Sequence, residues 1–126
     1  MQALLVLAGL AGFSGVALGA FGAHGLRQRF AKAGDGARRS EWWQTGASYH
    51  LAHALAIGLA AALDAPGGGG WPRCAAWAFA AGIALFSGSL YVMALTGLRR
   101  LGAITPLGGL AFLAGWGCVI AAGLGG

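Results

Sequence analysis

Long apolar segments, separated by short polar ones, make up most of the chain. Each is long enough for the roughly 20 residues that cross a bilayer as a helix. The pattern predicts an all-α, integral membrane four-helix bundle, with residues 1–126 forming a single transmembrane domain. Charged side chains bound four windows that contain none: before Arg27, Glu41 to Asp64, Arg73 to Arg99, and after Arg100. The helices are expected near residues 3–24, 42–64, 73–97 and 104–124.

Composition supports the same class of protein. Hydrophobic residues make up 58% of the chain and charged residues only 9%, whereas about a quarter of the residues in a soluble domain are charged. The four helices would use most of the chain, so no soluble domain is expected. The first apolar run lacks a basic start and is longer than the apolar core of a typical signal peptide. It is therefore expected to remain as a helix.

The basic residues are distributed unevenly among the loops. Only Arg73 belongs to the second loop, while the first and third loops hold the others: Arg27, Arg29, Lys32, Arg38, Arg39, Arg99 and Arg100. Because basic loops stay on the cytoplasmic side, both termini are predicted to lie on the non-cytoplasmic side. The net charge of +5 is then explained by topology and by anionic lipid headgroups. Nucleic-acid binding is not expected, since free basic helices and aromatic–basic motifs are missing.

Glycines recur along the first predicted helix in steps of three or four residues, which keeps them near one face. In lipid such a face lets a neighbouring helix approach closely, so the spacing predicts a packing face. The alternative is a composition that is generally rich in glycine. The glycines of the first helix are Gly9, Gly12, Gly15, Gly19, Gly22 and Gly25, and Gly108 and Gly109 leave the first turn of the fourth helix bare in the same way.

Polar side chains occur mainly in the half of each predicted span that is nearer the basic loops. Because polar groups in hydrocarbon are costly unless they face one another or water, these residues are expected to form one hydrogen-bonded cluster in the cytoplasmic half. His50 and His53 share a helix face, being three residues apart. The candidate residues are His24, Tyr49, His50, His53, Ser87, Ser89, Tyr91 and Thr105.

The cluster has a structural and a functional interpretation. Interhelical hydrogen bonds contribute about 0.6 kcal/mol each in membranes, so the cluster can simply hold the bundle together. Alternatively it binds a proton or a small solute, with His53 as the deepest imidazole. His53 is predicted to bond to a group on the third helix: Ser87, Ser89 or Tyr91.

Metal and catalytic sites are not expected. The chain has three histidines but no carboxylate inside the spans to complete a ligand set. A catalytic triad needs an acidic residue to orient its base, and a phosphate loop and a redox cysteine pair are also missing. The sequence therefore predicts a protein that is not an enzyme and has no cofactor.

Four motifs, occurring in order, resemble the YgdD-like family of small four-helix inner-membrane proteins of unknown function. They are GAFGAHGL, YHLAHAL, LFSGSLY and ITPLGG followed by GW. The resemblance covers nearly the whole chain and implies a multi-pass protein of the plasma (inner) membrane, but no reaction, substrate or cofactor. In that family the position of His50 can hold another polar residue such as Gln, which makes His53 the stronger functional candidate.

These features favour a binding, assembly or accessory component of the membrane. Its expected partners are the lipid bilayer and either further copies of the chain or another membrane protein. The alternative is an oligomeric carrier or channel for a proton or small polar solute, using the His53 cluster. Four short helices can hardly enclose a wide pore in one subunit, so that alternative requires an oligomer.

Overall fold

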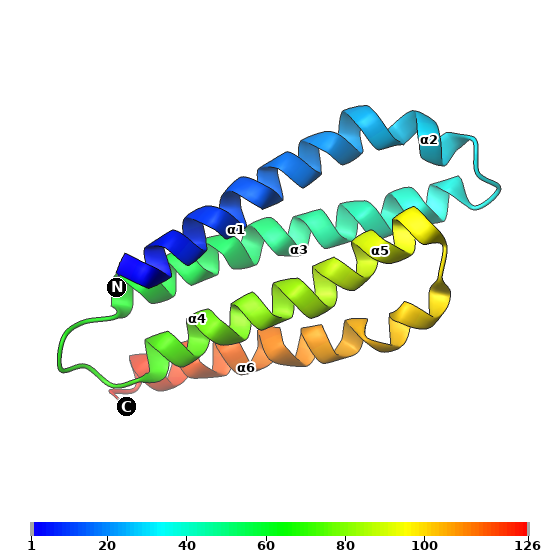
Figure 1. Ribbon diagram of the computed structural model, residues 1–126. Coiled ribbons are helices and arrows are strands. Elements are labelled where there is room, and N and C mark those ends of the chain that lie inside the picture. Colours follow the sequence, from blue (N-terminus) through cyan, green and yellow to red (C-terminus); the bar gives the residue numbers. More distant parts are fainter. Residues whose placement is uncertain (1, 126) are drawn as a thin grey trace.

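The computed structural model describes residues 2–125, which form an entirely helical structure of four parallel and antiparallel rods (Figure 1). All four rods are long and apolar enough to cross a membrane. Their elements are α1 (Gln2–Phe21), η1 (Gly22–Leu26), α2 (Arg27–Ala31), α3 (Gly36–Leu63), α4 (Trp71–Gly82), η2 (Ile83–Ser87), α5 (Gly88–Thr96), η3 (Arg99–Ala103) and α6 (Thr105–Gly123).

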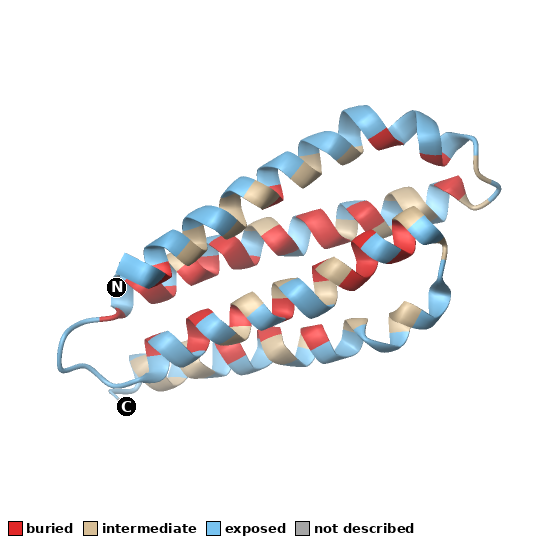
Figure 2. Ribbon diagram, viewed as in Figure 1, coloured by how far each residue is buried: buried red, intermediate tan, exposed pale blue. Residues whose placement is uncertain are grey.

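The rods pack as two hairpins joined through α3. Helix α1 lies against α3, and α4 lies against α6, while α3 also packs on α4 and α5. Half of the most apolar window of α3 is buried, against 11% for the first rod and 17% for the last. Figure 2 shows the same contrast, with buried positions gathered on the two inner rods. The first and last rods are therefore the outer faces of the bundle, and the two described ends of the chain lie together at one end (Figure 1).

The expected and observed helix boundaries differ most around the first loop. The first rod runs on to Ala31, and the second begins at Gly36. The extension is stabilised because Leu26 and Phe30 are buried in a cluster with Trp43. The turn can be this tight because Gly36 has no side chain, and a Cβ there would collide with the Phe30 carbonyl.

Each hairpin contains one π-helical turn, η1 in the first rod and η2 in the third. Such turns insert an extra residue into a helix and shift its backbone carbonyls away from their usual partners. Next to η1, the Trp43 indole donates to the Leu18 carbonyl at 2.8 Å. At the end of η2, the Ser87 hydroxyl donates to the Gly46 carbonyl at 2.7 Å. Both irregular turns are thus tied to the same stretch of α3.

The glycines of α1 and η1 do not form one packing face, contrary to the expectation from their spacing. A Cβ on Gly15 would lie 2.9 Å from Leu51 Cδ2, and one on Gly22 would collide with the Trp43 indole. Cβ atoms on Gly9, Gly12 and Gly19 would meet nothing within 4 Å. Each step of three residues falls about 60° short of a full turn, so the row drifts around the helix and leaves the interface.

The first turn of α6 repeats this contrast within two neighbouring positions. A Cβ on Gly108 would lie against the Phe86 backbone, whereas a Cβ on Gly109 would meet nothing within 4 Å. The close approach at this bare turn thus lies at Gly108 and not at Gly109.

An ion pair closes the end of the bundle where the described termini lie. Arg73 Nε is 3.1 Å from Asp64 Oδ1, and the Asp64 side chain is buried whereas that of Arg73 is mostly exposed. The Arg73 guanidinium, by hydrogen bonding, holds the pKa of Asp64 below its usual value. The pair joins the end of α3 to the start of α4, at the base of the glycine-rich loop.

Candidate functional site

His50 links three of the four rods through hydrogen bonds. Its Nδ1 is 2.9 Å from the Tyr91 hydroxyl on α5, and its Nε2 is 3.2 Å from the Ser14 hydroxyl on α1. Because the Ser14 hydroxyl already donates to the Leu10 carbonyl at 2.8 Å, it accepts from His50 Nε2–H. Nδ1 then accepts from the Tyr91 hydroxyl. The hydrogen bonds therefore run in one direction, from Tyr91 to His50, from His50 to Ser14 and from Ser14 to the Leu10 carbonyl.

His53 forms a separate set of bonds on another face of α3. Its Nδ1 donates to the Tyr49 carbonyl of the same helix at 2.8 Å, and its Nε2 accepts from the Trp116 indole of α6 at 3.2 Å. These two bonds use the single donor and single acceptor of a neutral imidazole. The prediction that His53 bonds to Ser87, Ser89 or Tyr91 is therefore wrong.

The hydroxyl groups of Ser87, Ser89 and Thr105, on the third and fourth rods, bond to groups other than the histidines. Ser87 is fully buried and bonds to the Gly46 carbonyl. Ser89 lies 2.6 Å from the Thr105 hydroxyl, which joins α5 to the start of α6. Each pair ties one helix to its neighbour without reaching either histidine.

The expected single cluster is thus divided into separate sets. His50 and His53 lie three positions apart on α3, but one turns toward α1 and α5 and the other toward α6. This follows from the central position of α3, which has helices of both hairpins as neighbours on different sides. Two candidates lie outside these sets: the His24 side chain is exposed on η1, and the Tyr49 ring is exposed to 46%.

Rings of α3, α4 and α6 surround His53. The His53 and Phe112 rings are stacked, with centroids 3.6 Å apart and planes at 12°. The Tyr49 ring is nearly parallel to both, at 5° to His53 and 18° to Phe112. Phe79 and Trp116 contact the same imidazole edge-on or tilted. His53 is therefore held in place by aromatic rings as well as by its two hydrogen bonds.

An open groove of about 620 Å³ lies beside this aromatic group. Its walls come from α3, η2 and α6 and include Tyr49, His53, Phe112 and Trp116. Its lining residues lie within the segments that are long and apolar enough to cross a membrane, so the groove lies at the level of the membrane interior. Whatever enters the groove would therefore come from the lipid phase.

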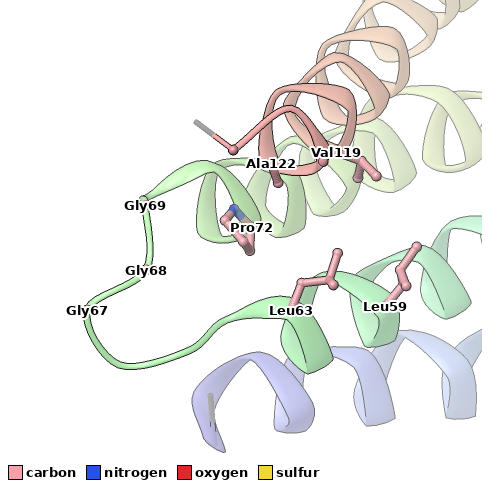
Figure 3. Close-up of a pocket in the computed structure, with 10 residues that line it drawn as sticks. Leu59, Leu63, Gly67, Gly68, Gly69, Pro72, Val119 and Ala122 are labelled. Atoms are coloured by element: carbon pink, nitrogen blue, oxygen red, sulfur yellow. The ribbon is translucent and has the colours of Figure 1, made fainter.

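Two further hollows have different linings. One of about 690 Å³ lies between α1 and α3 and is lined only by apolar or small residues such as Gly9, Gly12 and Gly58. The other, about 590 Å³, lies at the end of the bundle below the glycine-rich loop (Figure 3). There, Leu59 and Leu63 of α3 face Pro72 and Val119, so its lining side chains offer no polar group.

Sequence reasoning missed three side chains that partner the histidines. Ser14 and Trp116 complete the hydrogen bonds of His50 and His53, and Phe112 stacks on His53. Ser14 could have been recognised as a hydrogen-bonding residue, because it is the only hydroxyl residue in the first predicted span. Phe112 and Trp116 could not have been recognised in this way, since aromatic residues are ordinary components of an apolar helix.

Comparison with known proteins places these helices in a family. Residues 18–109 match the model of the family described as "Protein of unknown function (DUF423)". The chain is 42% identical over 123 residues to UPF0382 membrane protein YwdK of Bacillus subtilis (strain 168), covering 97% of this chain and 96% of that one. It is 43% identical over 124 residues to UPF0382 inner membrane protein YgdD of Escherichia coli (strain K12), covering 93% and 86%. No solved structure matches the chain.

The matches extend over nearly all of both relatives and include all four spanning rods. They confirm the resemblance inferred from the four motifs and the location in the plasma (inner) membrane. The family description assigns no activity. With four helices able to cross a bilayer and this degree of identity, the chain belongs to the UPF0382 (DUF423) family of multi-pass membrane proteins.

Proposed function

We propose that this protein is a binding or accessory component of the membrane that assembles with further copies of itself and catalyses no reaction. The groove between α1 and α3 is the observation that carries the proposal. It measures about 690 Å³ and is lined by Gly9, Gly12, Gly58 and neighbouring apolar side chains. Small residues let helix backbones approach closely, and van der Waals packing drives helix association in lipid.

The internal polar groups support an assembly role over transport. Within residues 2–125, every buried side-chain nitrogen and oxygen has a hydrogen-bond partner. His50 bridges α1, α3 and α5, and His53 bridges α3 and α6. Polar residues used in this way hold helices in register and need no solute.

The alternative is an oligomeric carrier or channel for a proton or small polar solute that uses His53. It is tested with the purified protein in liposomes that contain a pH-sensitive dye. Under our proposal the protein adds no proton flux over empty liposomes. A flux that disappears in the His53→Gln variant would replace the accessory role by transport.

The proposed arrangement in the membrane has both termini on the non-cytoplasmic side. The basic residues of α2, the start of α3 and η3 lie at the end of the bundle opposite the described termini (Figure 1). Arg73 is the basic residue at the other end. Loops rich in Lys and Arg remain in the cytoplasm, which supports this orientation.

A reporter fused after Gly126 tests the orientation. A fluorescent protein that matures only in the cytoplasm is expected to stay dark there, while alkaline phosphatase at the same position is expected to be active. The reason is the excess of Lys and Arg in the first and third loops. A bright fluorescent fusion together with an inactive phosphatase fusion would reverse the orientation.

Assembly is tested by comparing two glycines of α1. Gly12→Leu is expected to lower the number of copies seen by native mass spectrometry, while helical content stays unchanged. The added side chain would enter the groove, since a Cβ at Gly12 meets nothing within 4 Å. Gly15→Leu is the matched control and is expected to lower thermal stability, because its Cβ would lie 2.9 Å from Leu51 Cδ2. An unchanged copy number in Gly12→Leu would contradict assembly through this groove.

A further inference from the structure

The groove beside His53 has one polar side-chain group that the protein leaves unused. The imidazole of His53 uses both nitrogens, and the indole N–H of Trp116 is donated to it. Among the residues that the structure describes, no side chain or backbone group bonds to the Tyr49 hydroxyl, and this ring is exposed to 46%. A phenol inside hydrocarbon favours a hydrogen-bond partner, so a ligand with an acceptor oxygen fits here.

The position of Tyr49 limits where that oxygen would lie. Six positions separate Trp43 from Tyr49, or about 9 Å of helix rise. A side chain on a helix leans toward the helix N-terminus, so the Tyr49 hydroxyl is directed toward the end of the bundle that holds the basic loops. The polar end of an amphiphilic molecule would reach this level while its apolar part stays deeper in the membrane.

The rings beside the groove favour a flat ligand over a flexible chain. The planes of Tyr49, His53 and Phe112 lie within 18° of one another. Of these three rings, His53 and Phe112 are buried and stacked on each other, whereas Tyr49 is exposed. Aromatic faces prefer to stack in offset, parallel arrangements, so a planar ring can pack on Tyr49 in a way that an acyl chain cannot. Beyond them, the exposed side chains of Leu110 and Leu113 line the groove and can accompany an apolar tail.

We propose that this groove binds a lipid-soluble ring compound of the quinone class, with a ring carbonyl accepting a hydrogen bond from Tyr49. The ring would lie against the exposed Tyr49 ring, and its tail would follow Leu110 and Leu113 along α6. The volume of about 620 Å³ falls within the usual range for small-molecule sites. This binding does not depend on the proposed assembly, which uses the separate groove between α1 and α3.

The test measures binding of a benzoquinone with a ten-carbon tail to the protein in lipid nanodiscs by isothermal titration calorimetry. Saturable binding to one site per chain is expected. Tyr49→Phe is expected to weaken it about threefold to tenfold, because this variant removes one hydrogen bond and keeps the ring. Gly109→Phe is expected to abolish binding, since Gly109 lines the groove and a Cβ there meets nothing within 4 Å.

Two controls distinguish binding in this groove from an effect of assembly and from simple partitioning of an apolar tail. Gly12→Leu alters the groove between α1 and α3 and is expected to leave quinone affinity unchanged, even where it changes the number of copies. Methyl decanoate carries a carbonyl and a similar tail without the ring, and no saturable binding of it is expected. Equal affinity of the parent and Tyr49→Phe would overturn the proposal. So would methyl decanoate binding as tightly as the quinone, or no saturable quinone binding to the parent.

Discussion

Replacing Gly108 by alanine is expected to lower the free energy of unfolding by about 3 kcal/mol, the upper part of the range for overpacked positions. The new Cβ would lie 2.6 Å from Phe86 Cβ and 2.7 Å from Phe86 Cα. Part of this obstacle is backbone, which cannot rotate away as a flexible side chain can. Helix α6 would have to move from η2, and the bond between Ser89 and Thr105 beside this contact would be strained. Denaturant titration in one type of micelle measures the change.

Gly109→Ala is the matched control for this prediction. The two glycines are adjacent in the same helical turn, so helix propensity and membrane depth are nearly identical. A Cβ on Gly109 meets nothing within 4 Å. The free energy of unfolding of the Gly109→Ala variant is therefore expected to stay within about 0.5 kcal/mol of the parent value. Equal effects of the two substitutions would mean that the close contact with Phe86 does not determine stability.

Replacing His50 by leucine is expected to lower the free energy of unfolding by about 1–2 kcal/mol. This exceeds the roughly 0.6 kcal/mol of an average interhelical hydrogen bond in a membrane. The variant loses two bonds, to Ser14 and Tyr91, and leaves the buried Tyr91 hydroxyl without its partner. His50→Gln is expected to retain part of the stability, since an amide also donates and accepts.

A double-mutant cycle with Tyr91→Phe checks the origin of this loss. Removing the Tyr91 hydroxyl removes the group that His50→Leu leaves without a partner, while the ring still packs on Trp43. The double variant is therefore expected to be about 1 kcal/mol more stable than the sum of the single losses predicts. Additive losses would show that the two side chains do not act as a pair.

The number and class of the helices could be predicted from the sequence because the bilayer imposes one strict requirement. A spanning segment needs about 20 apolar residues with its backbone bonded internally, and uncharged windows of that length can be counted directly. The helix ends were less predictable. The first rod continues to Ala31 because Leu26 and Phe30 find a buried position against Trp43, and the pattern of charges holds no information about that contact.

The candidate polar residues could be recognised, but their partners could not. Helical periodicity shows that His50 and His53 point to related faces of α3. It does not show which rod covers each face, and here different rods do. Hydrogen-bond partners also include groups that polarity does not single out, such as the Gly46 and Leu18 carbonyls. A backbone acceptor is present at every position, so only the packed helices select one.

By itself, the sequence determined that this chain is a four-helix membrane protein with basic loops at one end, since hydrophobicity and charge act position by position. Only the tertiary structure decided which glycines are contact points, because Gly108 and Gly109 differ in their neighbours and not in their chemistry. It likewise decided that Tyr49 faces an open groove while His53 beside it is enclosed. Both distinctions depend on how neighbouring rods are placed, and that placement results from the packing of all four rods together.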